Sequence, residues 1–440
     1  MKALLLLTLF LPTFLPAAEH EFLDKARCLT LITEMEAHLE THILKPWYPR
    51  SVDKERGGFI QDYAEDWSEK RDGNKTLVYQ SRLTWMAAQV ALSYPEKAKE
   101  YIAYSNHGLD FLADKMWDKT NGGLYWSVDA TGKPTNEHNG EKHVYGISFA
   151  LYAASVNYKA TKNPKALELA QRTFDWLEKY ACDGGQNGYF EALNAKGEHY
   201  PEYGGDRLEK DLIGTAYGYR SMNTHIHLLE SFTAFYEVAP TAVRKFRLHA
   251  IYDLVHDKIC FSRGRSGMHL YFDEKFQPMP DLDSYGHDLE TAYLLRDAAA
   301  MLDLPPSTER DSVAFNLVFN ARSSGWDQAH GGFYNEGTFR KPIDKEKVWW
   351  VQAEALNALL MMATENPLLP VQKEYSNLFL REWGFIRDWQ IDNKNGGWIS
   401  YLEADGTPKP HQMKSDQWKD PYHQGRALIN VIERLKKLAK

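Results

Sequence analysis

The chain has 440 residues, 25% of them charged, and a formal net charge of −8 at pH 7. Basic residues are scattered along it, which excludes the concentrated positive patch of a nucleic-acid-binding protein. Three cysteines leave at least one thiol unpaired, so disulfides do not form the framework of the fold.

The N-terminus has the layout of a secretory signal peptide. Lys2 precedes an apolar run over residues 3–15, and the small residues Ala17 and Ala18 follow. The run is too short to cross a bilayer, and no later segment is long and apolar enough to do so. We therefore expect residues 1–18 to be removed and residues 19–440 to form a periplasmic or secreted protein without a membrane anchor.

Short motifs of glycine followed by apolar or aromatic residues recur along the chain. They read RGGFIQDY, NGGLYWSVD, NGYFEALN, SGMHLYFDE, HGGFYNEG and NGGWISYLEADG, anchored on Gly58, Gly123, Gly188, Gly267, Gly332 and Gly397. Four of the five intervals are 65 residues, and the third is 79 because it contains the polar insertion GEHYPEYGGDRLEKD. Such a period predicts six copies of one unit rather than the two or three domains that length alone suggests.

Between the motifs, apolar residues recur with helical spacing. The clearest examples are residues 81–94, 290–302, 351–365 and 425–440. Each repeat has room for two helices joined by a turn or short hairpin. Six such pairs in a ring predict an all-α (α/α)6 barrel that occupies residues 19–440 as one domain, and an open helical solenoid is the alternative.

Every repeat carries its unusual polar or aromatic side chains at a similar distance along the sequence from its anchoring glycine. They fall 17 to 26 residues after the anchoring glycine once the insertion is removed. In a closed ring this place lies at one end of the inner helices, so the side chains should converge on one central pocket. They are Arg82, His143, Tyr145, Asn223, His287, Trp349, Trp350, Trp418 and His423.

Helical spacing extends this set. Asn223, His227 and Glu230 share one helix face, whereas His225 points elsewhere and is expected to pack or lie at the surface. A spacing of three residues gives two more histidines a neighbour able to orient them, in the pairs His287–Glu290 and His423–Arg426.

Two predicted helix starts look alike. SYGH places Ser284 at the N-cap and His287 at the third helical position, and DPYH does the same with Asp420, Pro421 and His423. A helix N-terminus is partly positive and disfavours an imidazolium. Both histidines are therefore biased toward the neutral form, which is a competent base for a carbon-bound proton next to a carbonyl.

Other interpretations of these residues stay open. Zinc could be held by His227, His287 and His423, but the chain has neither an HExxH pattern nor a cysteine cluster, and we expect no metal. A glycosidase acid/base pair could come from Glu230, Glu290 and Glu354. Of the adjacent Trp349 and Trp350, one is expected in the pocket and one packed away. Four histidines without supporting residues are expected in loops or at the surface: His138, His199, His269 and His411.

The segments MNTHIHLLES, SYGHDLE, WWVQAEAL and WKDPYHQGRA resemble the N-acylglucosamine 2-epimerase superfamily, in particular its cellobiose and mannobiose 2-epimerase branch. The resemblance spans essentially the whole mature chain, and the WK-x-PYH run is its most branch-specific part. It implies an (α/α)6 barrel that needs no cofactor or metal. It also implies interconversion of glucose and mannose at the reducing end of β-1,4-linked disaccharides. We expect a monomer or weak dimer.

The matching motifs imply roles for individual residues. His287 and His423 correspond to the pair that exchanges the C2 proton, and His227 to a further essential histidine. Glu290 corresponds to the carboxylate paired with His287, and Arg82 to the arginine that holds sugar oxygens near C1 and C2. The substrate-binding positions correspond to Tyr145, Asn223, Trp350 and Trp418.

These residues predict removal of the C2 proton through an enediolate that Arg82 stabilises, with tryptophans stacking on the sugars. One rival is an aldose–ketose isomerase of the same superfamily, which would send the proton to C1. The others are a periplasmic glycoside hydrolase on the same barrel and a non-catalytic sugar-binding protein. Fold alone does not separate these functions.

Overall fold

The computed structural model describes residues 23–69, 73–184, 188–200, 209–260, 267–279 and 282–440. The signal peptide expected over residues 1–18 and residues 201–208 of the expected insertion lie outside the described residues. Among the helices of the described part, none is both long and apolar enough to cross a membrane. The three cysteines, Cys28, Cys182 and Cys260, are all free.

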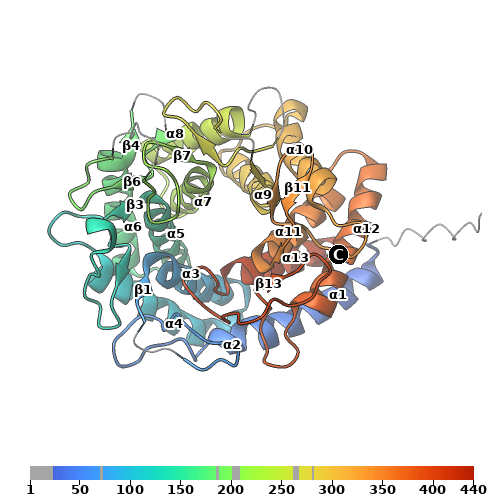
Figure 1. The fold of residues 1–440 in the computed structure, drawn as a ribbon, viewed down its shortest axis with the longest axis horizontal. Coiled ribbons are helices and arrows are strands. Elements are labelled where there is room, and N and C mark those ends of the chain that lie inside the picture. The colour runs from blue at the N-terminus through green and yellow to red at the C-terminus, as the bar shows by residue number, and fades with distance from the viewer. Residues whose placement is uncertain (1–22, 70–72, 185–187, 201–208, 261–266, 280–281) are drawn as a thin grey trace, which may run out of the picture.

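Two concentric layers of helices form a ring (Figure 1). Within the described ranges the inner layer consists of α3 (Leu77–Ser93), α5 (Val144–Thr161), α7 (Met222–Val238), α9 (Tyr285–Met301), α11 (Trp349–Glu365) and α13 (Tyr422–Leu438). The outer layer consists of α1 (Lys25–His38), α4 (Ala98–Phe111), α6 (Pro164–Trp176), α8 (Ala242–Asp253), α10 (Thr308–Gly325) and α12 (Leu369–Phe385). Successive inner helices contact each other, and α13 contacts α3. The ring therefore closes, as the barrel prediction requires and the open solenoid does not.

Most outer helices continue into a turn of π-helix. These turns are η1 (Leu39–Leu44), η3 (Leu112–Met116), η5 (Leu177–Ala181), η6 (Leu254–Ile259) and η8 (Ile386–Gln390). The other short helical pieces of the described segments are α2 (Lys45–Trp47), η2 (Pro95–Lys97) and η4 (Glu137–Asn139).

The two layers follow from two different residue patterns. Helix α5 has apolar or small residues around most of its circumference, and Ile147 and Leu151 are fully buried, as expected of a helix inside a core. Helix α6 is amphipathic and buries one stripe that includes Leu169 and Phe174. Burying such side chains stabilises the ring by roughly 1.5–3 kcal/mol each.

Short antiparallel strands link each repeat to the next. A strand that precedes an inner helix pairs with a strand from the following repeat. The pairs are β1 (Lys75–Thr76) with β2 (Ser127–Val128), β3 (Lys142–His143) with β6 (Ala192–Leu193), β7 (Arg220–Ser221) with β8 (Tyr271–Phe272), β9 (Asp283–Ser284) with β10 (Glu336–Gly337), and β12 (Lys347–Val348) with β13 (Tyr401–Leu402). Strand β11 (Pro342–Asp344) extends the β9–β10 pair, and β4 (Cys182–Asp183) pairs with β5 (Gly188–Tyr189). A bridge between Tyr63 and Ser415 joins the last repeat to the first.

The double glycine of the repeated motif has a backbone reason. Gly122 and Gly123 have φ values of +72° and +73°, in the left-handed region that side chains disfavour. The turn they form brings the Gly122 carbonyl within 2.6 Å of Lys142 Nζ, which also pairs with Asp118 at 2.8 Å. The turn therefore ties the end of an outer helix to the start of an inner one.

The same ion pair recurs around the ring. An aspartate five residues before the anchoring glycine pairs with the basic residue shortly before an inner helix. The pairs are Asp53–Lys75, Asp118–Lys142, Asp183–Arg220, Asp327–Lys347 and Asp392–Lys414. Because both partners are mostly buried, these pairs help to fix where five of the six inner helices begin, α9 being the exception among the described residues.

Candidate active site

A cleft with a volume of about 290 Å³ lies at the N-terminal ends of the inner helices. The structure brings most of the expected site residues to its wall, but neither His143 nor Glu290. The lining residues are Arg82, Tyr145, Asn223, His227, His287, Trp349, Trp350, Trp418 and His423, with Ile213, Asn335, Glu336, Val348 and Tyr401.

A larger cavity of about 660 Å³ lies toward the opposite ends of the inner helices. Its described lining includes Tyr152, Asp297 and Asn430, but no histidine. The smaller cleft is the candidate site because it gathers the acid–base groups.

Both tryptophans at the start of α11 line the cleft, which corrects the expectation that one would pack away. Trp350 contacts two imidazoles, with ring-centroid distances of 4.6 Å to His287 and 5.6 Å to His423. Trp349 meets Tyr401 edge-on at 5.6 Å. Both residues belong to the first turn of α11, where the end of the helix rather than one face borders the cleft.

His423, in the first turn of α13, is oriented by a carboxylate from α11. Its Nδ1 lies 2.5 Å from Glu354 Oε1. The same oxygen accepts a hydrogen bond from Arg426 at 2.7 Å, and Tyr293 donates to the other oxygen at 2.5 Å. Arg426 therefore acts on His423 through Glu354 and does not bond to the imidazole itself.

His227 is held in the same manner within α7. Its Nδ1 lies 3.0 Å from Glu230 Oε2, the contact expected from their spacing. Burial alone would raise the pKa of Glu230, but the charge of Arg426 and the hydrogen bond from His227 lower it to about 2. A carboxylate this acidic is ionised, so His227 donates from Nδ1.

His287 has a different partner from the expected one. Its Nδ1 lies 2.7 Å from the hydroxyl oxygen of Ser284. Glu290 is buried beneath the cleft, where Oε1 accepts a hydrogen bond from Arg426 and Oε2 has no hydrogen-bond partner within the described residues. The carboxylate thus bonds to Arg426 rather than to the imidazole. Glu290 acts on His287 only through its charge.

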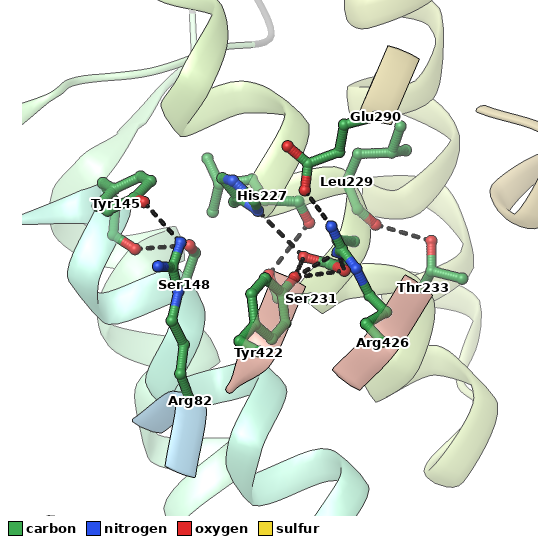
Figure 2. Close-up of polar contacts among 12 residues, drawn as sticks. Arg82, Tyr145, Ser148, His227, Leu229, Ser231, Thr233, Glu290, Tyr422 and Arg426 are labelled. Atoms are coloured by element: carbon green, nitrogen blue, oxygen red, sulfur yellow. Dashed lines mark hydrogen bonds and ion pairs between the residues drawn. The ribbon is translucent and has the colours of Figure 1, made fainter. Parts of the chain in front are cut away.

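Arg426 is the centre of a buried polar group under the cleft (Figure 2). Its guanidinium donates to Glu230, Glu290, Glu354 and the Tyr422 hydroxyl, and Tyr422 donates to Glu230 at 2.7 Å. Burial acts to lower the pKa of Arg426, but these carboxylates raise it well above its ordinary value. One permanent cation thus fixes the carboxylates that orient His227 and His423.

Arg82 presents a second permanent cation at the cleft wall. It donates to the Tyr145 hydroxyl at 3.0 Å and lies 3.6 Å from Asp420 (Figure 2 shows the Tyr145 contact). Its guanidinium also lies over the Phe149 ring at 4.4 Å and the Tyr422 ring at 4.8 Å. These contacts hold the charge beside the cleft, where it can stabilise a developing oxyanion.

The sequence of residues 58–427 matches the N-acylglucosamine 2-epimerase (GlcNAc 2-epimerase) family. The chain belongs to this family. The cellobiose 2-epimerase of Bacteroides fragilis is 32% identical, over 91% of this chain and 98% of its own length. A D-mannose isomerase of Marinomonas mediterranea is 24% identical, over 92% of this chain and 97% of its own length.

A solved structure has the same ring. The cellobiose 2-epimerase of Bacillus thermoamylovorans is 28% identical, covers 92% of this chain and 100% of its own, and superposes with a TM-score of 0.82. The (α/α)6 barrel is therefore confirmed. Epimerases and isomerases alike belong to the isomerase class, and this member of the family is an enzyme of that class.

The two imidazoles against Trp350 are neutral in this family member. Burial lowers the pKa of His287 to about 3, against a weaker opposing effect of Glu290. Burial and the charge of Arg82 lower the pKa of His423 well below its ordinary value. Neutral imidazoles can take a proton at neutral pH, so the site has its bases ready.

The start of α13 differs from the expected one by a residue. Pro421 occupies the N-cap and the helix begins at Tyr422, so His423 lies at the second helical position. Asp420 still bonds to the start of the helix, because its carboxylate accepts a hydrogen bond from the Tyr422 amide at 2.7 Å. Burial raises the pKa of Asp420 to about 6, although the nearby Arg82 charge opposes this.

Two further histidines of the repeats have structural roles. His225 is packed, as expected, and receives the Tyr189 amide at Nε2 while Nδ1 bonds to the Ser221 carbonyl. His143 does not reach the cleft, which corrects its inclusion in the converging set. Its Nε2 lies 2.9 Å from Asp211 at the end of the insertion, and it anchors that segment to the ring.

Two groups of metal-ligating side chains are compact within the part of the chain that the structure describes. They are His143–Glu191–Asp211 and Glu290–Glu354–His423. The zinc alternative, with three histidines as ligands, corresponds to neither group. In the second group Arg426 already donates to both carboxylates.

Five lining residues were not expected from the sequence. Glu336 and Asn335 lie at β10, Val348 at β12 and Tyr401 at β13, and Ile213 follows the insertion. Their positions in the Gly motifs could have identified Asn335, Glu336 and Tyr401, since β10 and β13 belong to those motifs. Ile213 has no such signal because it follows a segment that interrupts the period.

Proposed function

We propose that this protein is a 2-epimerase that inverts C2 of the reducing-end glucose or mannose of a β-1,4-linked disaccharide, either cellobiose or mannobiose. One observation carries the proposal. His287 and His423 pack against the same indole, that of Trp350, at a cleft that also holds the Arg82 guanidinium. The relatives named cellobiose 2-epimerase, at 32% and 30% identity, support the substrate class.

The chemistry follows from what these groups can do. With the sugar ring open, one neutral imidazole accepts the C2 proton, and the C–H electron pair forms the C1–C2 double bond. Charge then develops on O1, where Arg82 stabilises it. The C1–C2 unit turns, and the opposite imidazole takes up a proton from solvent beside the negative enediolate. This imidazolium gives one proton to the other face of C2 as the carbonyl reforms, and the first imidazole releases its extra proton to solvent, so both rings end neutral.

The remaining wall offers groups for sugar binding. Trp350 and Trp418 are half-buried, so part of each ring is available for stacking. The side-chain oxygen of Asn223 has no hydrogen-bond partner within the described residues and can accept one from a sugar hydroxyl.

The carboxylates argue against the glycosidase alternative. Glycoside hydrolysis needs two carboxyl groups that flank the scissile bond. Glu230, Glu290 and Glu354 all accept hydrogen bonds from Arg426 and none of them lines the cleft. Glu336 is the one carboxylate among the described lining residues, and a single carboxylate does not make the pair.

Product analysis tests the proposal. Cellobiose and mannobiose are incubated with the purified protein, and the products are separated by chromatography and identified by NMR. The proposal predicts a disaccharide of unchanged mass with inverted C2. A ketose product would indicate the aldose–ketose isomerase, monosaccharides the hydrolase, and unchanged sugar a binding protein; each of these results would overturn the epimerase proposal.

We also propose that the protein acts outside the cytoplasm as a monomer or weak dimer. The N-terminal sequence of residues 1–18 supports export. Fractionation of the native cells and the N-terminus of the mature chain test this, and cytoplasmic protein that retains Met1 would contradict it. Sedimentation of the purified protein measures the oligomeric state.

A further inference from the structure

The three cleft histidines differ in the group that holds Nδ1. His423 and His227 face carboxylates, Glu354 at 2.5 Å and Glu230 at 3.0 Å. His287 faces the hydroxyl of Ser284 at 2.7 Å. The difference matters because the partner at Nδ1 decides which nitrogen of a neutral imidazole carries the proton.

A carboxylate leaves no choice of tautomer. An ionised carboxylate only accepts hydrogen bonds, so Nδ1 of His423 must donate and Nε2 must hold a lone pair. Burial raises the pKa of Glu354, but the Arg426 charge and the hydrogen bonds from Arg426 and Tyr293 oppose this and favour the ionised form. The same reasoning places the proton of His227 on Nδ1, against Glu230.

A hydroxyl can either donate or accept, so the surroundings of Ser284 decide. Ser284 is 2% exposed and occupies the N-cap of α9, but its side chain accepts no backbone N–H there, unlike Ser221 at the N-cap of α7. Within the described residues its hydroxyl has one hydrogen-bond partner, Nδ1 of His287. If the hydroxyl accepted from Nδ1, its own buried hydrogen would lack an acceptor, which is costly.

We propose that Ser284 is a positioning residue whose hydroxyl donates to Nδ1 of His287, so that His287 presents Nε2–H to the cleft while His423 presents a lone pair. The two rings against Trp350 would then form a donor and an acceptor without either carrying a charge. Arg82, which repels an imidazolium on either ring, favours this neutral arrangement.

The arrangement gives the two imidazoles different roles in the resting enzyme, and this part rests on the proposed function. In the resting enzyme His423 is the ring able to remove a proton from C2. His287 offers an N–H to a substrate oxygen, as a neutral imidazole at a helix N-terminus does when it polarises a carbonyl. When His287 is instead protonated on both nitrogens, the Ser284 hydroxyl can turn and accept from Nδ1–H.

Nitrogen NMR of the imidazoles tests the tautomers without any substrate. The ¹⁵N shifts distinguish a protonated ring nitrogen from an unprotonated one, and His287→Gln and His423→Gln spectra assign the signals. We expect opposite tautomers, with the proton on Nε2 in His287 and on Nδ1 in His423. A proton on Nδ1 of His287 in the resting enzyme would overturn the proposal. Because no sugar is added, this result is independent of whether the protein proves to be an epimerase.

Kinetic variants test the role of the hydroxyl. Ser284→Ala should lower kcat on the order of 10- to 100-fold and move the Nδ1 signal of His287, whereas Ser284→Thr, which keeps a hydroxyl, should restore most of both. The matched control is Ser221→Ala, which removes the corresponding hydroxyl before α7 and should lower the melting temperature with kcat and the His287 signal unchanged. Wild-type kcat and an unmoved Nδ1 signal in Ser284→Ala would refute the assignment.

Discussion

Glu354→Gln tests how much the buried carboxylate contributes to the action of His423. The substitution keeps the size of the side chain and removes its charge. The hydrogen bonds around Glu354 indicate how the side-chain amide of the glutamine would be oriented. Its oxygen takes the place of Oε1, where it still accepts from Arg426 and His423, and its NH₂ takes the place of Oε2, where the Tyr293 hydroxyl can turn to accept. His423 therefore keeps the same tautomer, and only the charge interaction is lost.

The magnitude follows from the kind of hydrogen bond. A hydrogen bond to a charged group contributes about 1.5–3 kcal/mol, against about 1 kcal/mol for a neutral one. This charge acts mainly when His423 becomes an imidazolium after taking the C2 proton. The difference is about 0.5–2 kcal/mol. Because about 1.4 kcal/mol corresponds to a tenfold rate change, kcat should fall about 2- to 30-fold. The fold should persist, since Arg426 retains Glu230 and Glu290 as partners.

The assay measures initial rates of disaccharide epimerisation, with circular dichroism and urea unfolding to confirm that the variant is folded. The matched control is Glu382→Gln on α12. Burial raises the pKa of Glu382 well above its ordinary value and favours the neutral side chain, and Glu382 does not line the cleft, so the change should leave kcat unaltered. A Glu354→Gln enzyme with wild-type kcat would refute the reasoning that Glu354 supports the charged form of His423.

Further predictions concern the two bases, the repeated ion pair and a packed histidine. His287→Ala and His423→Ala should each abolish epimerisation while circular dichroism shows a folded barrel, and near-normal turnover in either would remove that residue from the mechanism. Lys142→Met leaves the buried Asp118 without its cation and should lower the free energy of unfolding in urea by about 3–5 kcal/mol; a loss below about 1 kcal/mol, as for a surface pair, would show that the buried pair is not a stabilising link. Burial lowers the pKa of His225 from 6.5 to about 3, so below pH 6.5 this imidazole binds its proton only in the unfolded chain, and stability falls as the pH falls. His225→Gln should reduce this pH dependence by about 0.7 kcal/mol per pH unit at pH 6.5, rising to about 1.4 near pH 5, in urea titrations; an unchanged slope would contradict the assignment.

The sequence predicted the ring and most of the polar and aromatic residues at the cleft because both depend on periodicity. The glycine anchors recur with one period, and side chains at equal distances from them must reach the same level of a closed ring. The helix face shared by His227 and Glu230 was likewise predictable, because it depends only on the geometry of one helix.

Contacts between distant segments were not predictable in this way. Glu354 lies 69 residues before His423, and Glu290 lies 136 residues before Arg426, so only the closed ring brings them together. Local geometry also left a choice at His287, which has Ser284 three residues before it and Glu290 three residues after it. The choice was decided by Arg426, which binds Glu290. The buried pairs of aspartate with lysine or arginine were not predicted, because the repeats were aligned on their glycine, aromatic and histidine residues and not on their charged residues.

The most direct test of the central claim is the position of solvent deuterium in the product. Cellobiose or mannobiose is converted in D₂O, and the isolated epimer is analysed by proton NMR and mass spectrometry. If His287 and His423 exchange the proton of C2, the product carries one deuteron at C2 and none at C1. An inverted product that retains the original hydrogen at C2 would contradict the account, as would deuterium located at C1.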